Sequence, residues 1–109
     1  MEIDPRFLSS RPRRVLEWNE DPDGRAVLLR PKFGKGRLAQ WIASFFKSPY
    51  YQIHLDDVGT LIWKLCDGDT PLSRVVERMR KEFGDRIEPA ELRLHQFISQ
   101  MTRSRLIQF

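Results

Sequence analysis

A chain of 109 residues, 40% of them hydrophobic and 31% charged, is long enough to form one globular domain with its own core. Its single cysteine excludes an internal disulfide bond and favours a reducing compartment. No apolar run approaches the roughly 20 residues that span a bilayer, and residues 1–10 lack the apolar core of a signal peptide. Composition therefore predicts a cytoplasmic protein and does not favour a membrane partner.

The formal net charge of +4 is unevenly distributed along the chain. Residues 1–47 contain ten basic and six acidic residues, whereas residues 48–109 contain nine of each, so the whole excess belongs to the first part. A basic surface attracts nucleic acid, anionic lipid or acidic peptides, and it is equally consistent with a solvated face that binds nothing.

The N-terminal part of the sequence predicts an arm and a β-hairpin. Residues 1–12 have no apolar period, which predicts a flexible basic arm before a single domain over residues 13–109. Residues 13–18 (RRVLEW) and 25–31 (RAVLLRP) predict two short strands. Between them, residues 19–24 (NEDPDG) have the side chains and the glycine typical of a turn.

An extra helix is predicted between the second and third strands. The polar side chains of residues 37–47 (RLAQWIASFFK) form one narrow helical stripe, and the rest of the surface is apolar. This apolar surface suggests a docking face for a partner, a second copy of the chain or a membrane, or else a helix packed on its own domain. The candidate docking residues are Trp41, Ile42, Phe45 and Phe46. Residues 50–55 (YYQIHL) then predict the third strand.

Three helices are predicted in the second half, from apolar residues at helical spacing and from the residues at the helix ends. Asp56 caps the first helix, and Gly68 closes it in a left-handed conformation. Thr70 caps the second helix, Gly84 ends it, and Pro89 opens the third. A three-stranded antiparallel sheet followed by three helices, the last two tightly joined, predicts an α+β domain of helix-turn-helix type.

The stretch LCDGDTP, residues 65–71, is the part of the chain that looks most like a reactive site. Cys66 follows Ile62 by four residues on an apolar helix face, where burial raises the pKa of a thiol and makes it unreactive. Asp67 and Asp69 match only the first two ligand positions of a calcium loop, and one cysteine with two scattered histidines cannot assemble a zinc site. We therefore expect no catalytic residue, no metal site and no cofactor.

Two stretches carry a family resemblance: HLDDVGTLIWKLCDGDTPLSRVVERMRKEFG (residues 54–84) and LRLHQFISQMTRSRLI (residues 92–107). Their ordered residues resemble the PqqD family of small peptide-binding proteins, whose namesake serves pyrroloquinoline quinone biosynthesis. The resemblance covers residues 50–107 well and the N-terminal strands loosely. The matching residues are Leu55, Asp56, Ile62, Trp63, Leu65, Cys66, Asp67, Gly68, Thr70, Phe97, Leu106 and Ile107.

The resemblance implies a winged-helix-like fold without an active site, which captures the leader part of a precursor peptide and presents it to a modifying enzyme such as a radical S-adenosylmethionine enzyme. The leader would pair with the third strand and pack against the third helix. The implied peptide-binding residues are Tyr50, Tyr51, Gln52, Ile53, His54, Arg93, Phe97, Gln100 and Arg103. Three departures from the family pattern are the extra apolar helix, Arg105 where the family usually has glycine before Leu106, and Ser73 where it usually has glutamate near the start of the second helix.

A DNA-binding winged helix is the alternative, because a helix-turn-helix shape and a positive net charge both suit nucleic acid. The third helix would present Arg93, Gln96, Gln100 and Arg103 to DNA. However, Glu91 lies near the N-terminus of that helix, where DNA readers usually make base contacts. Nucleic acid is therefore the less favoured partner.

Overall fold

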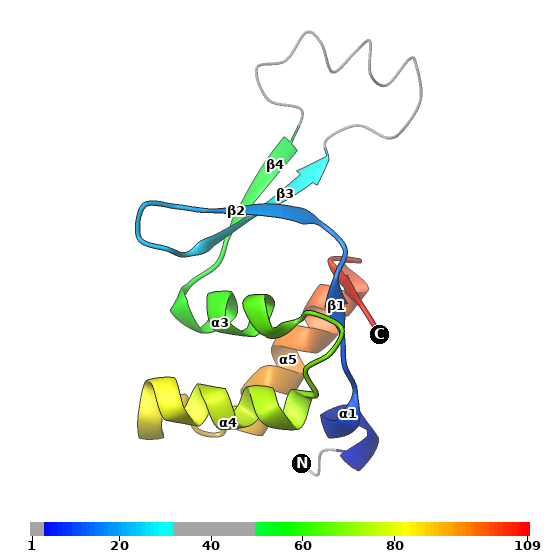
Figure 1. Ribbon diagram of the computed structural model, residues 1–109, viewed down its shortest axis with the longest axis vertical. Helices are drawn as coiled ribbons and strands as arrows, with labels where there is room; N and C mark the ends of the chain where they lie inside the picture. Colours follow the sequence, from blue (N-terminus) through cyan, green and yellow to red (C-terminus); the bar gives the residue numbers. More distant parts are fainter. Residues whose placement is uncertain (1–3, 32–49) are drawn as a thin grey trace, which may run out of the picture. The chain divides into compact units, whose positions relative to one another are not determined.

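The computed structural model describes residues 4–31 and 50–109, which belong to two compact units. The first unit comprises residues 1–15 and 57–109 and contains all the described helices; the second comprises residues 16–56 and contains a β-sheet (Figure 1). The predicted helix at residues 37–47 lies outside the described residues. So do its candidate docking residues Trp41, Ile42, Phe45 and Phe46.

The sheet unit consists of β2 (Glu17–Glu20), β3 (Ala26–Pro31) and β4 (Tyr50–His54). All pairings are antiparallel, in the order β2-β3-β4, so the predicted hairpin and three-stranded antiparallel sheet are confirmed. The hairpin turn forms because the Asp21 carboxylate accepts hydrogen bonds from the backbone of Asp23 and Arg25, each at 2.9 Å.

The predicted first strand, residues 13–18, is divided between the two units. β1 (Arg13–Arg14) pairs antiparallel with β5 (Ile107–Gln108) in the helical unit, and β2 begins at Glu17 in the sheet unit. The predicted apolar tail of the chain thus contains a strand that the sequence pattern did not reveal. A local run of strand-forming residues does not specify which partner each residue pairs with, because pairing is decided by tertiary context.

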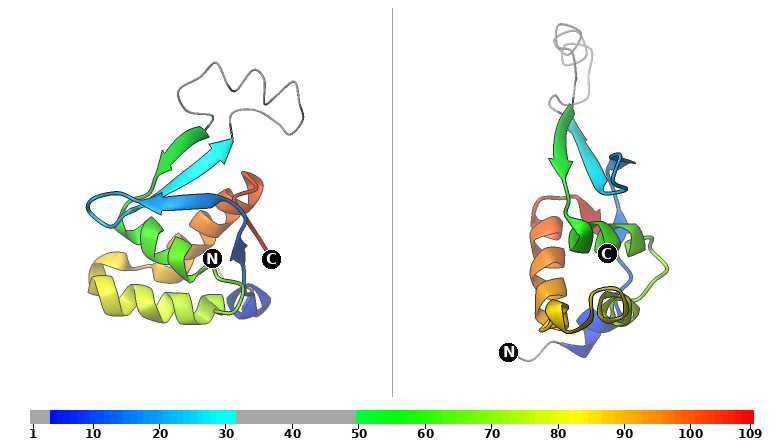
Figure 2. Two further views of the ribbon diagram at one scale, coloured as in Figure 1. Left: turned by 45° about the horizontal axis from the view of Figure 1, so that its top comes forward. Right: turned by 90° about the vertical axis from the view of Figure 1, so that its left-hand side faces the viewer.

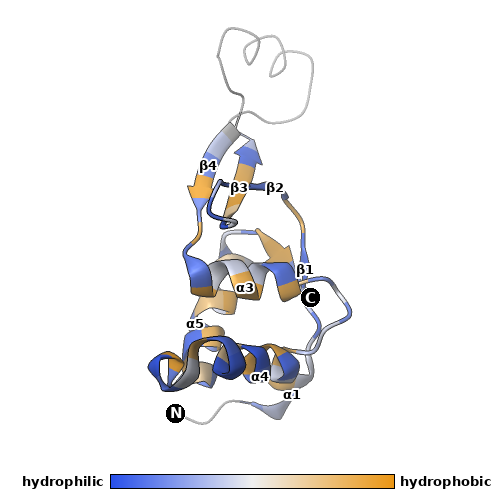
Figure 3. Ribbon diagram, turned by 60° about the vertical axis from the view of Figure 1, so that its left-hand side comes forward, coloured by the Kyte–Doolittle hydropathy of each residue, from blue (hydrophilic) through white to orange (hydrophobic). Residues whose placement is uncertain are grey.

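The helical unit contains the three helices that the sequence predicted: α3 (Asp57–Leu65), α4 (Leu72–Phe83) and α5 (Ala90–Arg103). The 3₁₀ helix η1 (Gly84–Ile87) connects the last two (Figure 2). The apolar residues that recur at helical spacing are buried on the inward faces of these helices. The outward face of α4 is hydrophilic (Figure 3). Fully buried side chains in this core include Ile62, Trp63, Leu72, Val75, Met79, Leu94 and Ile98.

Two of the predicted helix ends differ from the structure. Thr70 does not cap α4, because its hydroxyl donates to Asp67 Oδ2 at 2.9 Å and the helix begins at Leu72 after Pro71. Gly68 has the expected positive φ of +84°, but it lies beyond the end of α3, in the loop. Gly84 ends α4 with φ +64°, as predicted.

In the segment expected to be a flexible arm, Pro5–Ser9 form a short helix, α1. Asp4 caps this helix by accepting a hydrogen bond from the Arg6 backbone at 2.9 Å. The Phe7 ring packs against His95 of α5, with ring centroids 4.9 Å apart. Asp4 and Pro5 are a local helix-start signal, and the aromatic contact with a residue distant in sequence holds the short helix against α5.

Candidate functional site

The outer edge of β4 is the first candidate site. β4 pairs with β3 on one side, and no strand of the described residues pairs with its other side. Leu55 donates its backbone N–H to Ala26 at 3.0 Å, which fixes the alternation of the ladder. Because hydrogen-bonded and non-hydrogen-bonded pairs alternate, the backbone N–H and C=O groups of Gln52 and His54 point away from β3. An extended peptide could pair with these groups.

The side chains of β4 lie on the two faces of this edge strand. Tyr51 is exposed over 59% of its surface, Gln52 and His54 are also exposed, and Ile53 is half-buried. An exposed aromatic ring on an edge strand offers apolar contact to a bound chain, since edge strands accept partners through both backbone and side chains. The backbone of Tyr50 begins the strand.

The outward face of α5 is the second candidate site. Phe97 is half-buried, whereas Arg93, Gln100 and Arg103 are exposed. At about 100° of rotation per residue, Phe97 and Gln100 lie within about 40° and 20° of Arg93, so these three share one face. Arg103 lies about 80° from Arg93 around the helix axis, on a flank of that face. The structure thus brings the predicted strand residues together along one edge and most of the helix residues together along one face. A single groove formed by β4 and α5 stays a prediction.

The loop at residues 65–71 has a structural role. Cys66 is fully buried, and burial raises the pKa of its thiol to about 12, so it carries no thiolate at neutral pH. The predicted inert packing of Cys66 is confirmed. The Asp67 carboxylate accepts hydrogen bonds from the backbone of Asp69 and then of Thr70, and both lower its pKa. The Asp67 carboxylate therefore holds the loop together, because its hydrogen bonds come from backbone N–H groups of the loop itself.

The most strongly paired charges lie where α4 meets α5. The Arg80 guanidinium donates hydrogen bonds to Glu88 at 2.7 Å and to Glu91 at 2.7 Å, and these bonds, first the one to Glu88, raise the pKa of the guanidinium. The same contact lowers the pKa of Glu88. These side chains are about half-exposed and satisfy one another, so they form a surface network that joins two helices. The described residues contain no group of three or more side chains able to hold a metal ion.

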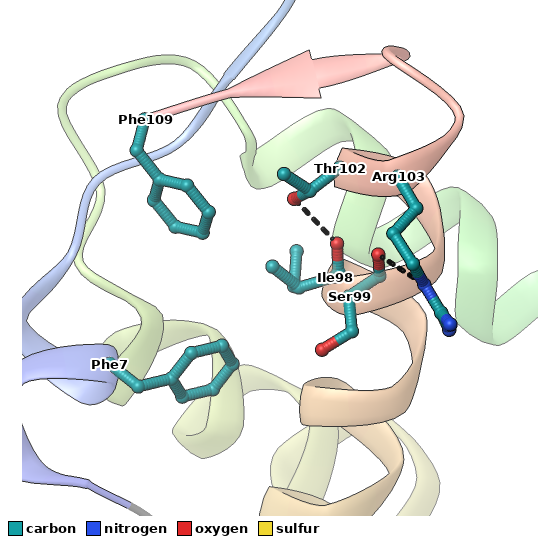
Figure 4. A pocket seen from close by; sticks show the side chains of 6 residues that line it. All are labelled: Phe7, Ile98, Ser99, Thr102, Arg103 and Phe109. Atoms are coloured by element: carbon teal, nitrogen blue, oxygen red, sulfur yellow. Dashed lines mark hydrogen bonds between the residues drawn. The ribbon is translucent and has the colours of Figure 1, made fainter.

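A pocket of about 300 Å³ in the helical unit was not predicted from the sequence. Phe7 of α1 and Phe109 after β5 lie opposite Ile98 and Thr102 of α5 across it, with Ser99 and Arg103 also on its wall (Figure 4). Its residues come from three separate parts of the chain, which is why no motif reveals it. The only local signals are Phe7 in a polar segment and Phe109 in the short apolar tail that contains the buried Ile107.

The open edge of β4 and the exposed face of α5 are the kinds of surface through which small domains bind peptides. A family model described as coenzyme PQQ synthesis protein D (PqqD) matches residues 49–107, more than half of the chain. The chain therefore belongs to the PqqD family, whose members are non-catalytic, peptide-binding proteins of PQQ synthesis. No curated protein and no solved structure matches the chain. Within the described residues, no helix is long and apolar enough to cross a membrane.

Proposed function

We propose that the protein is a non-catalytic adaptor that captures the leader of a precursor peptide by strand addition to β4. It then presents the peptide to a modifying enzyme, in pyrroloquinoline quinone synthesis or a related peptide pathway. The observation that carries this proposal is the edge position of β4, where the backbone groups of Gln52 and His54 point outward. Strand addition draws its affinity from such groups, and membership of a peptide-binding family supports it.

The outward face of α5 would supply selectivity. Phe97 offers a half-buried ring to an apolar leader side chain, and Arg93 offers a cation to an acidic one. Gln100 extends this face, and Arg103 lies at its flank. We propose that a leader paired with β4 also contacts these residues, as the resemblance to a winged-helix-like family implies.

The partners follow from the same proposal. A radical S-adenosylmethionine enzyme is the proposed recipient of the bound leader. Trp41, Ile42, Phe45 and Phe46 remain candidates for docking that enzyme or a second copy of the chain. Nothing in the described residues or in the family match favours DNA over a peptide as the ligand.

The sharpest test removes one outward N–H group from β4. Gln52→Pro deletes a backbone donor that faces away from β3 and leaves the β3–β4 hydrogen bonds in place, since an edge position tolerates proline. Gln52→Ala is the matched control, because it shortens the side chain and keeps the N–H group. We expect Gln52→Pro to weaken binding of the leader encoded beside the gene about tenfold, and Gln52→Ala to leave it nearly unchanged.

Calorimetric titration of both variants with synthetic leader peptides measures this difference. Thermal melts must first show that the proline variant remains folded. Equal affinity of the two variants for a leader that binds the unmodified protein would remove strand addition from the proposal. Chemical-shift changes confined to residues outside β4 and α5 would remove the proposed site altogether.

A further inference from the structure

The pocket between α1, α5 and the end of β5 is held in place by contacts on each side. Phe7 is fixed by the capped helix α1 and by its ring contact with His95. Phe109 directly follows β5, which pairs with β1 through Arg13 and Gln108. The pocket wall on α5 is a regular helix. The walls formed by Phe7 and by α5 are therefore set by folded elements before any ligand arrives, which lowers the entropic cost of binding.

The chemistry of the lining is apolar with one cationic group. Phe7, Ile98 and Phe109 supply apolar surface, and Phe109 is exposed over 62% of its area. The Thr102 hydroxyl already donates to the Ile98 carbonyl at 2.7 Å, so it is engaged within its own helix. The lining includes no acidic residue. The volume of about 300 Å³ lies at the lower end of the range for ligand sites and suits a single large side chain.

Arg103 gives this pocket its charge preference. Its Nε donates weakly to the Ser99 carbonyl at 3.4 Å (Figure 4). Within the described residues, its two terminal nitrogens have no carboxylate partner. By contrast, Arg80 on α4 is already paired with two glutamates. An arginine beside an apolar pocket, with its planar fork available, favours a carboxylate next to the side chain that fills the pocket.

We propose that this pocket binds a short acidic segment of a partner protein, with one large apolar side chain inserted between Phe7 and Phe109 and a neighbouring carboxylate bound by Arg103. Aromatic residues, phenylalanine among them, and arginine are enriched at protein–protein interfaces. The site lies wholly within the helical unit; it shares Arg103 with the flank of the proposed leader face, but Phe7, Ile98 and Phe109 take no part in leader capture at β4. An adaptor with this second surface can hold a partner while its strand edge remains available.

The test uses the full chain and a synthetic peptide blocked at both ends, in which one phenylalanine lies between two aspartates in a Gly/Ser background. Two matched peptides replace the phenylalanine by alanine or both aspartates by asparagine. Binding is measured by fluorescence polarisation and mapped by amide chemical shifts. We expect the parent peptide to shift residues on the α5 wall of the pocket, and each matched peptide to bind about three- to tenfold more weakly.

Variants of the protein separate the two contributions. Arg103→Gln should weaken the parent peptide about three- to tenfold and leave the asparagine peptide unaffected, because the charge partner is already absent there. Phe109→Ala should weaken the parent peptide and leave the alanine peptide unaffected. Arg74→Gln, an exposed arginine on α4, is the control for net charge and should change nothing. Thermal melts confirm that each variant is folded.

Several results would overturn the proposal. Shifts that map to Arg93 and Phe97 instead of the pocket would assign the peptide to the proposed leader face. Benzoate binding as tightly as the peptide would make the occupant a small carboxylate. A dimer in sedimentation that Phe109→Ala converts to a monomer would make the occupant a second copy of this chain. Absence of binding at millimolar peptide would show that the pocket is not a peptide site.

Discussion

Arg105 occupies a backbone conformation that ordinary side chains avoid. Its φ is +60°, in the left-handed region, directly after α5 ends at Arg103. The chain turns there because the Arg105 N–H donates to Thr102 at 3.0 Å and the Leu106 N–H donates to Met101 at 2.9 Å. This is the position where the family resemblance places glycine. A side chain at such a φ costs about 1–2 kcal/mol, since its Cβ crowds the following carbonyl.

Arg105→Gly should therefore stabilise the protein. We expect the free energy of unfolding to rise by about 0.5–1 kcal/mol, because relief of the left-handed strain exceeds the added entropy of glycine in the unfolded chain. Urea denaturation measures the change. Arg105→Ala is the matched control, which removes the same charge but keeps the Cβ and should give no gain. If alanine and glycine stabilise equally, the effect arises from the lost charge and not from the backbone.

At the scale of elements, the helices were predictable because one face of each is decided by local spacing. α3, α4 and α5 lie where the apolar periodicity placed them, and Gly84 ends α4 as expected. The errors concern elements that depend on distant partners. α1 is held by the contact of Phe7 with His95, and β1 needs β5 from the other end of the sequence. Local propensity carries no information about such partners.

The candidate binding sites likewise include one that local sequence could predict and one that it could not. The edge position of β4 could be predicted, since a third strand after a hairpin pairs with its neighbour and leaves one side open. The pocket could not, because its walls come from residues 7, 98–103 and 109. Threonine is common at helix N-caps, which is why the sequence predicts a cap at Thr70, but its hydroxyl donates a hydrogen bond to the nearby Asp67 carboxylate instead.

The two faces of α5 should respond differently to truncation. Leu94 is fully buried, so Leu94→Ala should lower the free energy of unfolding by about 2–5 kcal/mol. Phe97 is only half-buried, so Phe97→Ala should cost less stability but weaken leader binding about tenfold. Denaturation and calorimetric titration measure the two effects. Unchanged leader affinity in a folded Phe97→Ala protein would remove the outward face of α5 from the proposed groove.

At the scale of the whole molecule, the N-terminal segment forms part of the helical unit. Ser10 accepts a backbone hydrogen bond from Leu72 at 3.0 Å, and Pro12, which is buried, accepts one from Gly68 at 2.9 Å. The Arg14 guanidinium donates to the carbonyls of Trp63 and Lys64, at 3.0 and 2.8 Å, where α3 ends. Residues 4–15 therefore connect the loops and ends of helices that are distant in sequence.

Deletion of residues 1–12 should destabilise the helical unit. It removes the acceptors at Ser10 and Pro12 and the ring of Phe7, so we expect the melting temperature to fall by at least about 5 °C. Differential scanning calorimetry measures the fall, and deletion of residues 1–3 is the control. Equal melting temperatures for the two deletions would show that the segment only lies on the surface without stabilising it.

The pairing of β1 with β5 also sets an order for folding during synthesis. The sheet unit is contiguous, so all its residues have been made once residue 56 is joined to the chain. The helical unit pairs residues 13–14 with residues 107–108, so it cannot close completely until residue 108 has left the ribosome. β1 can meet its contacts at residues 66–68 earlier, but it gains its β5 partner only after residues 107–108 are made.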